Sequence, residues 1–380
     1  MISLTRVSIL SMTLAVATSA LAQPEATRSV RPLAGATETR TPGLVELKGK
    51  VALTVAGAPV AKRFVLRYPA GDWNGALVIG AHGGSGGNDF DPTGKVIGTD
   101  ETALDDVIGR HAVASRFAYA SVDRDGAIST AGGLALTNQF AELVVTELTA
   151  RLGRAPLRRY LLGLSMGGGI ARAAAEAVGT PYAGVLIVAG ANGDLPTRAA
   201  RQTRISELWP QIDPKTHPGL PATDAAVVAF AAAIGTPVEA RRLWPYTAAG
   251  AMRAAASSPA PGENSSALPR VPTIEVAGTW DDFVVSELRA YRARVAPASR
   301  HRLYLVEGVW HMSGDDDGVQ SFMYVASRMG LDPDVAAAMG QGPSYLATVR
   351  EAFDRLVAWV ERGTEPPPSQ TVRPGQPLQK

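Results

Sequence analysis

The chain has 380 residues, of which 46% are hydrophobic and 19% are charged, and its 37 basic and 35 acidic residues leave a net charge of +2. This balance is typical of a folded globular protein and disfavours disordered and fibrous classes. The basic residues are scattered in small groups such as Arg241 and Arg242. Such groups are typical of solvated faces, so we expect no nucleic-acid partner.

The N-terminus has the pattern of a secretory signal. An apolar run from Val7 to Ala17 follows the positive charge of Arg6, and Ala20-Leu21-Ala22 offers small residues for cleavage by signal peptidase. The run is shorter than the ~20 residues that cross a bilayer, which disfavours an uncleaved membrane anchor. Because the chain has no cysteine, we expect neither disulfides nor a lipid anchor. We predict that residues 1–22 are removed and that the mature protein is periplasmic or extracellular.

The first elements after the signal are an arm and a hairpin. Residues 23–43 are rich in Thr, Arg, Pro and Ala without periodicity, which predicts an extended arm. Two β-rich runs, 44–55 and 61–70, flank a turn at Ala56-Gly57-Ala58-Pro59 and predict an antiparallel hairpin. Folding is therefore expected to begin near Leu44.

Short apolar runs then alternate with helical stretches. Continuous apolar strands separated by amphipathic helices predict a mostly parallel α/β sheet with helices on both faces. Ligands bind beyond the carboxyl ends of the strands in such sheets. The predicted strands are 75–84, 116–123, 158–165 and 182–191, and the predicted helices are 100–112, 133–152 and 166–178.

A segment without clear strands interrupts this alternation at residues 193–269, which we interpret as a helical cap inserted into the core. The core thus comprises 44–192 and 270–363, and residues 364–380 are predicted to form a flexible polar tail because they are rich in proline. The second part of the core is predicted to contain strands at 271–280 and 301–310 and helices at 284–295 and 343–362.

The motif Gly163-Leu164-Ser165-Met166-Gly167 lies between a predicted strand and a predicted helix. This is the setting of a nucleophile elbow, in which a strained turn raises the serine hydroxyl above the sheet. Glycine two residues before and after the serine leaves room for that turn. The following helix directs its first amides toward a developing oxyanion, so the N–H of Met166 is one predicted donor.

A glycine-rich loop follows the strand at 75–84 and offers a second oxyanion donor. We predict the N–H of Gly84, or of its neighbour Ser85, because glycines let the backbone approach a substrate closely. Without the elbow, the same glycines would indicate only a tight turn between a strand and a helix.

A serine nucleophile needs a base, and the chain has five histidines. His311 follows the carboxyl end of the last predicted core strand, which favours a base over a surface-loop histidine. His82 precedes the glycine loop and is predicted to be a structural hydrogen-bonding residue, whereas His111, His217 and His301 lie at a helix end, in a cap loop and at the opposite end of a strand. Asp281 and Asp282 follow the preceding predicted strand, 271–280, and either carboxylate could orient the imidazole of His311.

The order Ser165, Asp281, His311, with an insertion after the first, resembles the α/β-hydrolase superfamily over residues 60–192 and 270–362. In that family the acid often lies in a G-T-x-D-x-x-V stretch, which matches Gly278, Thr279 and Val284 and favours Asp281 over Asp282. The resemblance implies an α/β-hydrolase fold with a Ser-His-Asp triad.

The predicted reaction is hydrolysis of a carboxylic ester through an acyl-enzyme, with no cofactor and no metal. Trp280 and Trp310 adjoin the acid and the base, and they are predicted to line an apolar pocket unless they pack in the core. The run Asp315 to Asp317 lacks the alternating spacing of a calcium loop, so a solvated loop that caps a helix is the favoured interpretation.

Three alternatives stay open at this point. The same residues would serve a serine peptidase or amidase, or an acyltransferase, although an export signal fits poorly with the last of these. A non-catalytic binding module on the same fold is the third, because a fold does not determine a function.

Overall fold

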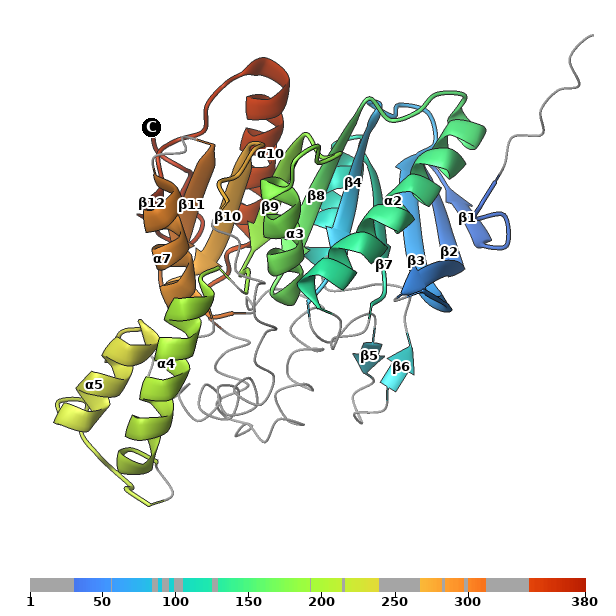
Figure 1. Ribbon diagram of the computed structural model, residues 1–380. Helices are drawn as coiled ribbons and strands as arrows, with labels where there is room; N and C mark the ends of the chain where they lie inside the picture. The colour runs from blue at the N-terminus through green and yellow to red at the C-terminus, as the bar shows by residue number, and fades with distance from the viewer. Residues whose placement is uncertain are drawn as a thin grey trace, which may run out of the picture.

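The computed structural model describes residues 31–55, 57–83, 88–90, 96–98, 105–124, 129–191, 193–213, 216–238, 267–281, 284–296, 300–311 and 342–380. These residues form a ten-stranded sheet in the order β1-β2-β3-β7-β4-β8-β9-β10-β11-β12, with a separate pair β5-β6 (Figure 1). The strands are β1 (Thr37–Thr41), β2 (Leu44–Val55), β3 (Ala58–Pro69), β4 (Ala76–Ala81), β5 (Asn88–Phe90), β6 (Val96–Gly98), β7 (Ala118–Val122), β8 (Arg158–Leu164), β9 (Gly184–Val188), β10 (Thr273–Gly278), β11 (His301–Val306) and β12 (Gln370–Val372).

The sheet is parallel from β7 to β12 and antiparallel from β1 to β7. The predicted α/β fold class and the hairpin β2-β3 are therefore confirmed. The helices are α1 (Arg110–Ala114), which continues a helical turn at Asp105–Gly109, α2 (Thr130–Leu152), α3 (Met166–Glu176), α4 (Leu195–Leu208), which a short turn at Trp209–Gln211 extends, α5 (Ala225–Ile234), α7 (Val285–Val295) and α10 (Leu346–Arg362).

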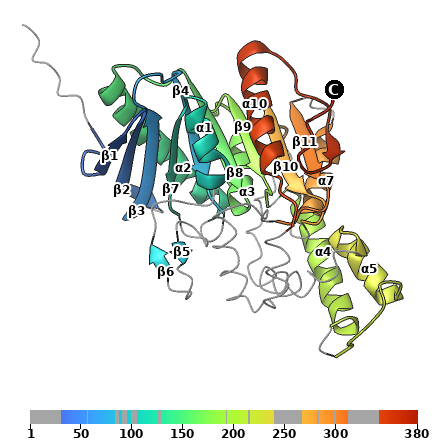
Figure 2. The same cartoon turned by 180° about the vertical axis from the view of Figure 1, so that it is seen from behind.

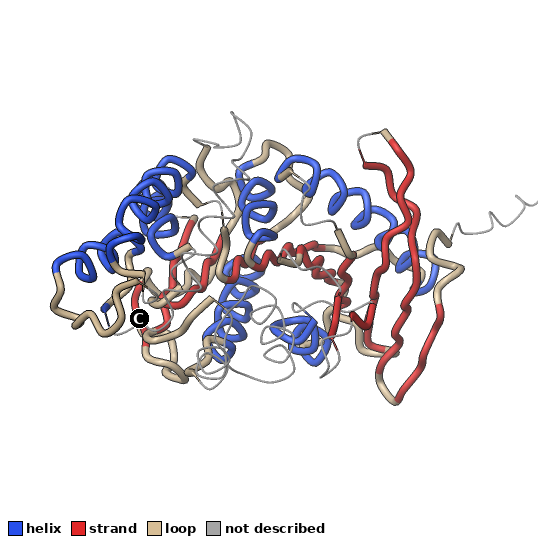
Figure 3. The backbone as a smooth tube through the Cα atoms, turned by 90° about the horizontal axis from the view of Figure 1, so that it is seen from below, coloured by secondary structure: helices blue, strands red, loops and turns tan. Residues whose placement is uncertain are grey.

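Helices cover both faces of the sheet. Helices α2, α3 and α7 lie on one face, and α1 and α10 lie on the other (Figures 1 and 2). Seen from below, the strands form a row between the two helical layers (Figure 3). Adjacent residues of β8 divide between the layers, because Leu161 joins the core beneath α2 and α3 while Leu162 joins the core beneath α10. Double-sided burial explains why the parallel strands are continuously apolar.

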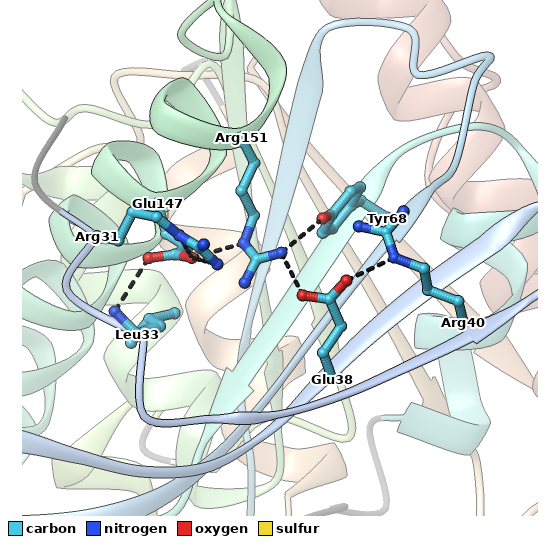
Figure 4. Close-up of polar contacts among 7 residues, drawn as sticks. All are labelled: Arg31, Leu33, Glu38, Arg40, Tyr68, Glu147 and Arg151. Carbon is cyan, nitrogen blue, oxygen red and sulfur yellow. Dashed lines mark hydrogen bonds and ion pairs between the residues drawn. The ribbon is translucent and has the colours of Figure 1, made fainter. Parts of the chain in front are cut away.

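The N-terminal arm, which was predicted to be extended and separate from the core, contributes a strand to the sheet. The sheet begins at Thr37 instead of Leu44, because β1 pairs with β2 in antiparallel register. Glu147 of α2 is fully buried there and accepts hydrogen bonds from Arg31 (3.2 Å), from the N–H of Leu33 (3.0 Å) and from Arg151 (2.5 Å; Figure 4). The arm is thus docked on the core by a buried carboxylate.

Exchanging Glu147 for glutamine is expected to lower the free energy of unfolding by about 1–3 kcal/mol, because charge-assisted hydrogen bonds are lost at a buried site. Urea denaturation of the variant measures this change. The matched control is Glu142→Gln on the same helix, whose exposed pair with Arg159 contributes about 0–1 kcal/mol. Equal effects of the two substitutions would contradict the anchoring role of Glu147.

The C-terminal residues also differ from expectation. The segment 364–380 was predicted to be a flexible tail, but β12 extends the sheet beside β11. Tyr304 donates to the carbonyl of Pro367 (2.7 Å), and the N–H of Leu378, whose side chain is buried, donates to Glu351 (3.0 Å). The prolines flank the strand and leave its ladder intact, and β12 covers what would otherwise be an open edge of β11.

The segment predicted to form a cap is helical where the structure describes it. Helices α4 and α5 follow β9 and pack on one another around Phe230. Arg201 of α4 forms a buried ion pair with Glu287 of α7 (2.8 Å), which attaches this helical pair to the core. Residues 239–266 lie outside the described part of the chain. No helix among the described residues is long and apolar enough to cross a membrane.

Candidate active site

The turn between β8 and α3 has the strained backbone that the sequence predicts. Ser165 has φ +52° and ψ −118°, a region that few residues other than glycine adopt and that costs about 1–3 kcal/mol. The end of the neighbouring strand β9 and the residues that follow it stabilise this turn through two hydrogen bonds. The N–H of Ser165 donates to the carbonyl of Val188 (3.0 Å), and the N–H of Ala191 donates to the carbonyl of Ser165 (2.8 Å).

Close contacts between backbones explain the glycines of the motif. A Cβ atom on Gly167 would lie 1.9 Å from the carbonyl oxygen of Ala81 at the end of β4, and one on Gly163 would lie 2.3 Å from the carbonyl oxygen of Gly167. Neither position can hold a side chain without moving the main chain. The glycines therefore bring β4, β8 and α3 together as well as permitting the turn.

Three predicted side chains converge at the carboxyl ends of the strands. The Nε2 atom of His311 lies 2.8 Å from the Oγ atom of Ser165. Its Nδ1 atom lies 2.9 and 3.0 Å from the two carboxylate oxygens of Asp281. Asp281 is fully buried and His311 is 8% exposed. This is the arrangement in which a histidine takes a proton from a serine while a carboxylate orients its ring.

The loop that carries the acid packs closely against the loop that carries the base. A Cβ atom on Gly278 would lie 1.8 Å from the carbonyl oxygen of Val309, so only glycine fits there. The hydroxyl of Thr279 accepts from the N–H of Gly308 (3.0 Å). The G-T pair before the acid is thus needed to pack the strand end of β10 against the loop after β11.

Tyr345 was not predicted to belong to this region. Its hydroxyl donates to the carbonyl of His311 (3.0 Å) and so holds the backbone of the base. Tyr345 directly precedes α10, and its place in the sequence gives no indication of a partner 34 residues away.

The remaining predicted site residues have different outcomes. Met166 is the first residue of α3, as expected of an oxyanion donor. Trp310 is buried and Trp280 is half-buried, and their place in a substrate pocket stays a prediction. The predictions for Gly84, Ser85, Asp282 and Asp315 to Asp317 fall outside the described residues. Within the described ranges, no group of three or more acidic or histidine side chains is placed to hold a metal ion.

His82, in the loop after β4, makes structural hydrogen bonds as predicted, but its partner Arg124 was not predicted. His82 is buried, and its Nε2 atom accepts from the N–H of Arg124 (2.8 Å) while its Nδ1 atom contacts the carbonyl of Gly83 (2.5 Å). Burial, together with the positive charge of Arg124, lowers the pKa of His82 to about 4. His82 is therefore neutral near pH 7, with its proton on Nδ1.

The low pKa of His82 makes stability depend on pH. The unfolded chain binds a proton at this residue below a pH of about 6.5, whereas the folded chain binds it only near pH 4. The free energy of unfolding is therefore expected to decrease as the pH falls from about 6.5 to about 4. Thermal denaturation across this interval should show a flatter pH dependence for His82→Asn than for the wild type, and an unchanged slope would contradict the assignment.

A comparison with protein families identifies the family of this fold. A family model described as an alpha/beta hydrolase domain matches residues 139–376, well over half of the chain. The chain belongs to the α/β-hydrolase family. The resemblance predicted from the sequence motifs is thereby confirmed, and so is the predicted fold class.

Solved structures similar to this α/β-hydrolase include several esterases. Feruloyl esterase B from Aspergillus oryzae is 13% identical, with a TM-score of 0.49 over 85% of this chain and 82% of that one. Carboxyl esterase 2 from the mycorrhizal fungus Tuber melanosporum is 14% identical, with a TM-score of 0.40 over 85% and 88%. The metagenomic carboxylesterase EstE1 is 17% identical, with a TM-score of 0.44 over 77% and 88%. No curated protein matches the chain.

Proposed function

We propose that this α/β-hydrolase cleaves carboxylic esters with Ser165 as nucleophile, His311 as general base and Asp281 as the acid that orients it. The observation that carries the proposal is the continuous series of hydrogen bonds from Ser165 through His311 to the buried Asp281. A serine hydroxyl needs such a base before it can attack a carbonyl near neutral pH.

The reaction follows from the positions of these atoms. His311 takes the proton of the Ser165 hydroxyl at Nε2 as the Oγ atom attacks the ester carbonyl, and the charge of Asp281 stabilises the imidazolium at Nδ1. Collapse of the tetrahedral intermediate transfers the proton to the leaving alcohol. Water then attacks the acyl-enzyme with His311 again as base, which releases the carboxylic acid and restores Ser165.

The oxyanion is stabilised by main-chain amides in this proposal. Met166 begins α3, so its N–H lies at the positive end of the helix dipole, next to the nucleophile. The second donor comes from the glycine loop after β4, for which the sequence analysis predicts Gly84 with Ser85 as the alternative. No cofactor or metal takes part in this chemistry.

The proposal includes export of the protein. Cleavage after Ala22 would leave Arg31 and the β1 segment in the mature chain, where Arg31 contacts Glu147. Mature protein isolated from the native host should begin at Gln23 or within a few residues of it, as determined by N-terminal sequencing. An intact Met1 would contradict cleavage and leave the hydrolase assignment untouched.

A substrate panel tests the proposed reaction. We expect turnover of p-nitrophenyl and aryl esters, with much lower turnover of aminoacyl amides, and a preference for apolar or aromatic acyl groups if Trp280 and Trp310 line the pocket. Faster cleavage of amides would replace the esterase by the amidase alternative. Transfer of the acyl group to an added alcohol or amine in preference to water would indicate an acyltransferase.

A further inference from the structure

The loop after β4 lies directly against the proposed nucleophile. A Cβ atom on Gly83 would lie 3.2 Å from the Cβ atom of Ser165 and 3.8 Å from its Oγ atom. A Cβ atom on Gly167 would likewise lie 2.6 Å from the carbonyl oxygen of His82. The peptide groups of His82 and Gly83 are therefore packed directly against the nucleophile elbow.

The guanidinium of Arg124, which follows the end of β7, contacts the same loop. Its Nη2 atom donates to the carbonyl of His82 and, at 3.4 Å, to the carbonyl of Gly83. The N–H of the same residue donates to His82 Nε2, whose Nδ1–H in turn donates to the Gly83 carbonyl. Arg124 is 4% exposed. Its side chain and its backbone thus hold both carbonyls of the loop, directly or through the imidazole.

The orientation of a carbonyl determines the orientation of the next amide. In a trans peptide the C=O and the following N–H point in opposite directions. The carbonyl of His82 belongs to the peptide group that carries the N–H of Gly83. The contact of the guanidinium with the His82 carbonyl therefore also fixes the orientation of the Gly83 N–H, in a glycine that lies directly against Ser165.

We propose that Arg124 is a positioning residue for ester hydrolysis, which holds the His82 and Gly83 peptide groups at the start of the glycine loop from which the second oxyanion donor comes. The inference rests on the proposed function. An arginine suits this task because the Nη2 group carries two N–H donors in the fixed plane of the guanidinium, one for each carbonyl, whereas the donors of a lysine ammonium rotate freely on a flexible stem. Within the described part of the chain, the hydrogen bonds of Arg124 go to His82 and Gly83, so the residue acts through the loop.

The test compares Arg124→Lys and Arg124→Gln with the wild type on an activated ester. We expect kcat to fall by about 10- to 100-fold in Arg124→Gln and less in Arg124→Lys, with KM changed by less than about threefold, because oxyanion contacts strengthen in the transition state. The affinity for a trifluoromethyl ketone, which forms a tetrahedral adduct with the serine, should fall by the same factor as kcat/KM.

Arg67→Gln is the matched control. Arg67 lies on β3, is 6% exposed and forms an ion pair with Glu46 on β2 (2.7 Å). Its partner in the β3-β7 pairing is Tyr119, which lies several residues before the end of β7 and therefore away from the loop that Arg124 contacts. Its loss should lower thermal stability while kcat and ketone affinity stay within about twofold of the wild type. This control separates the cost of removing a buried arginine from a specific effect on the oxyanion.

Two results would overturn the inference. One is a folded Arg124→Gln protein with kcat within about twofold of the wild type; the other is a loss of kcat without a matching loss of ketone affinity. If Arg124→Gln does not fold, Arg124→Lys decides by the same two measurements. A wild-type protein that neither hydrolyses esters nor binds the ketone would instead overturn the proposed function, and the inference with it.

Discussion

Replacement of Ser165 by alanine is expected to lower ester hydrolysis by about 10⁴- to 10⁶-fold, because it removes the hydroxyl oxygen that lies 2.8 Å from Nε2 of His311. Stability should change little. The serine side chain makes no capping hydrogen bond to α3, and alanine retains its Cβ atom in the same packed turn. Steady-state kinetics on the best ester of the panel, together with a thermal melt, measure both effects.

A second serine gives the opposite pattern and serves as the control. Ser129 caps α2 by accepting from the N–H of Gly132 (3.1 Å), so Ser129→Ala should cost about 1 kcal/mol of stability without loss of activity. Retained hydrolysis in Ser165→Ala would mean that another residue is the nucleophile. A large loss of stability in that variant would mean that the hydroxyl supports the fold.

Asp281→Asn is expected to lower kcat by about 10³- to 10⁴-fold. The asparagine amide can donate to Nδ1 of His311, which would place the ring proton on Nε2 and leave no acceptor for the proton of Ser165. The measurement is kcat across pH 6–9, with circular dichroism to verify folding. The adjacent substitution Asp282→Asn should cost far less, and the reverse order would show that the second carboxylate is the acid.

The convergence of Ser165, His311 and Asp281 could be predicted from the sequence because each of their motifs lies at a strand end. Ser165, Asp281 and His311 follow β8, β10 and β11, and a parallel sheet brings those ends to one edge. Spacing alone left Asp281 and Asp282 equivalent, since adjacent residues share the same place in the pattern. The family resemblance decided between them, and Asp281 is the residue whose carboxylate contacts His311.

The contacts that the sequence did not reveal join residues far apart in the chain. Arg124 holds a loop 41 residues earlier, and Glu147 anchors Arg31, 116 residues earlier. The N-terminal arm and the C-terminal segment have polar, proline-containing sequences without periodicity. Their composition therefore predicted an extended arm and a flexible tail. Their strands β1 and β12 are stabilised by pairing with existing strands, and such tertiary pairing leaves little trace in local sequence.

The most direct test of the central assignment is covalent labelling of the folded protein with a fluorophosphonate, followed by peptide mass spectrometry. The probe reacts with a serine that a neighbouring base has activated, so we expect a single phosphonyl adduct on the peptide that contains Ser165, and none on Ser165→Ala. A folded wild-type protein that takes up no label, or that carries it on another residue, would contradict the assignment of Ser165 as nucleophile.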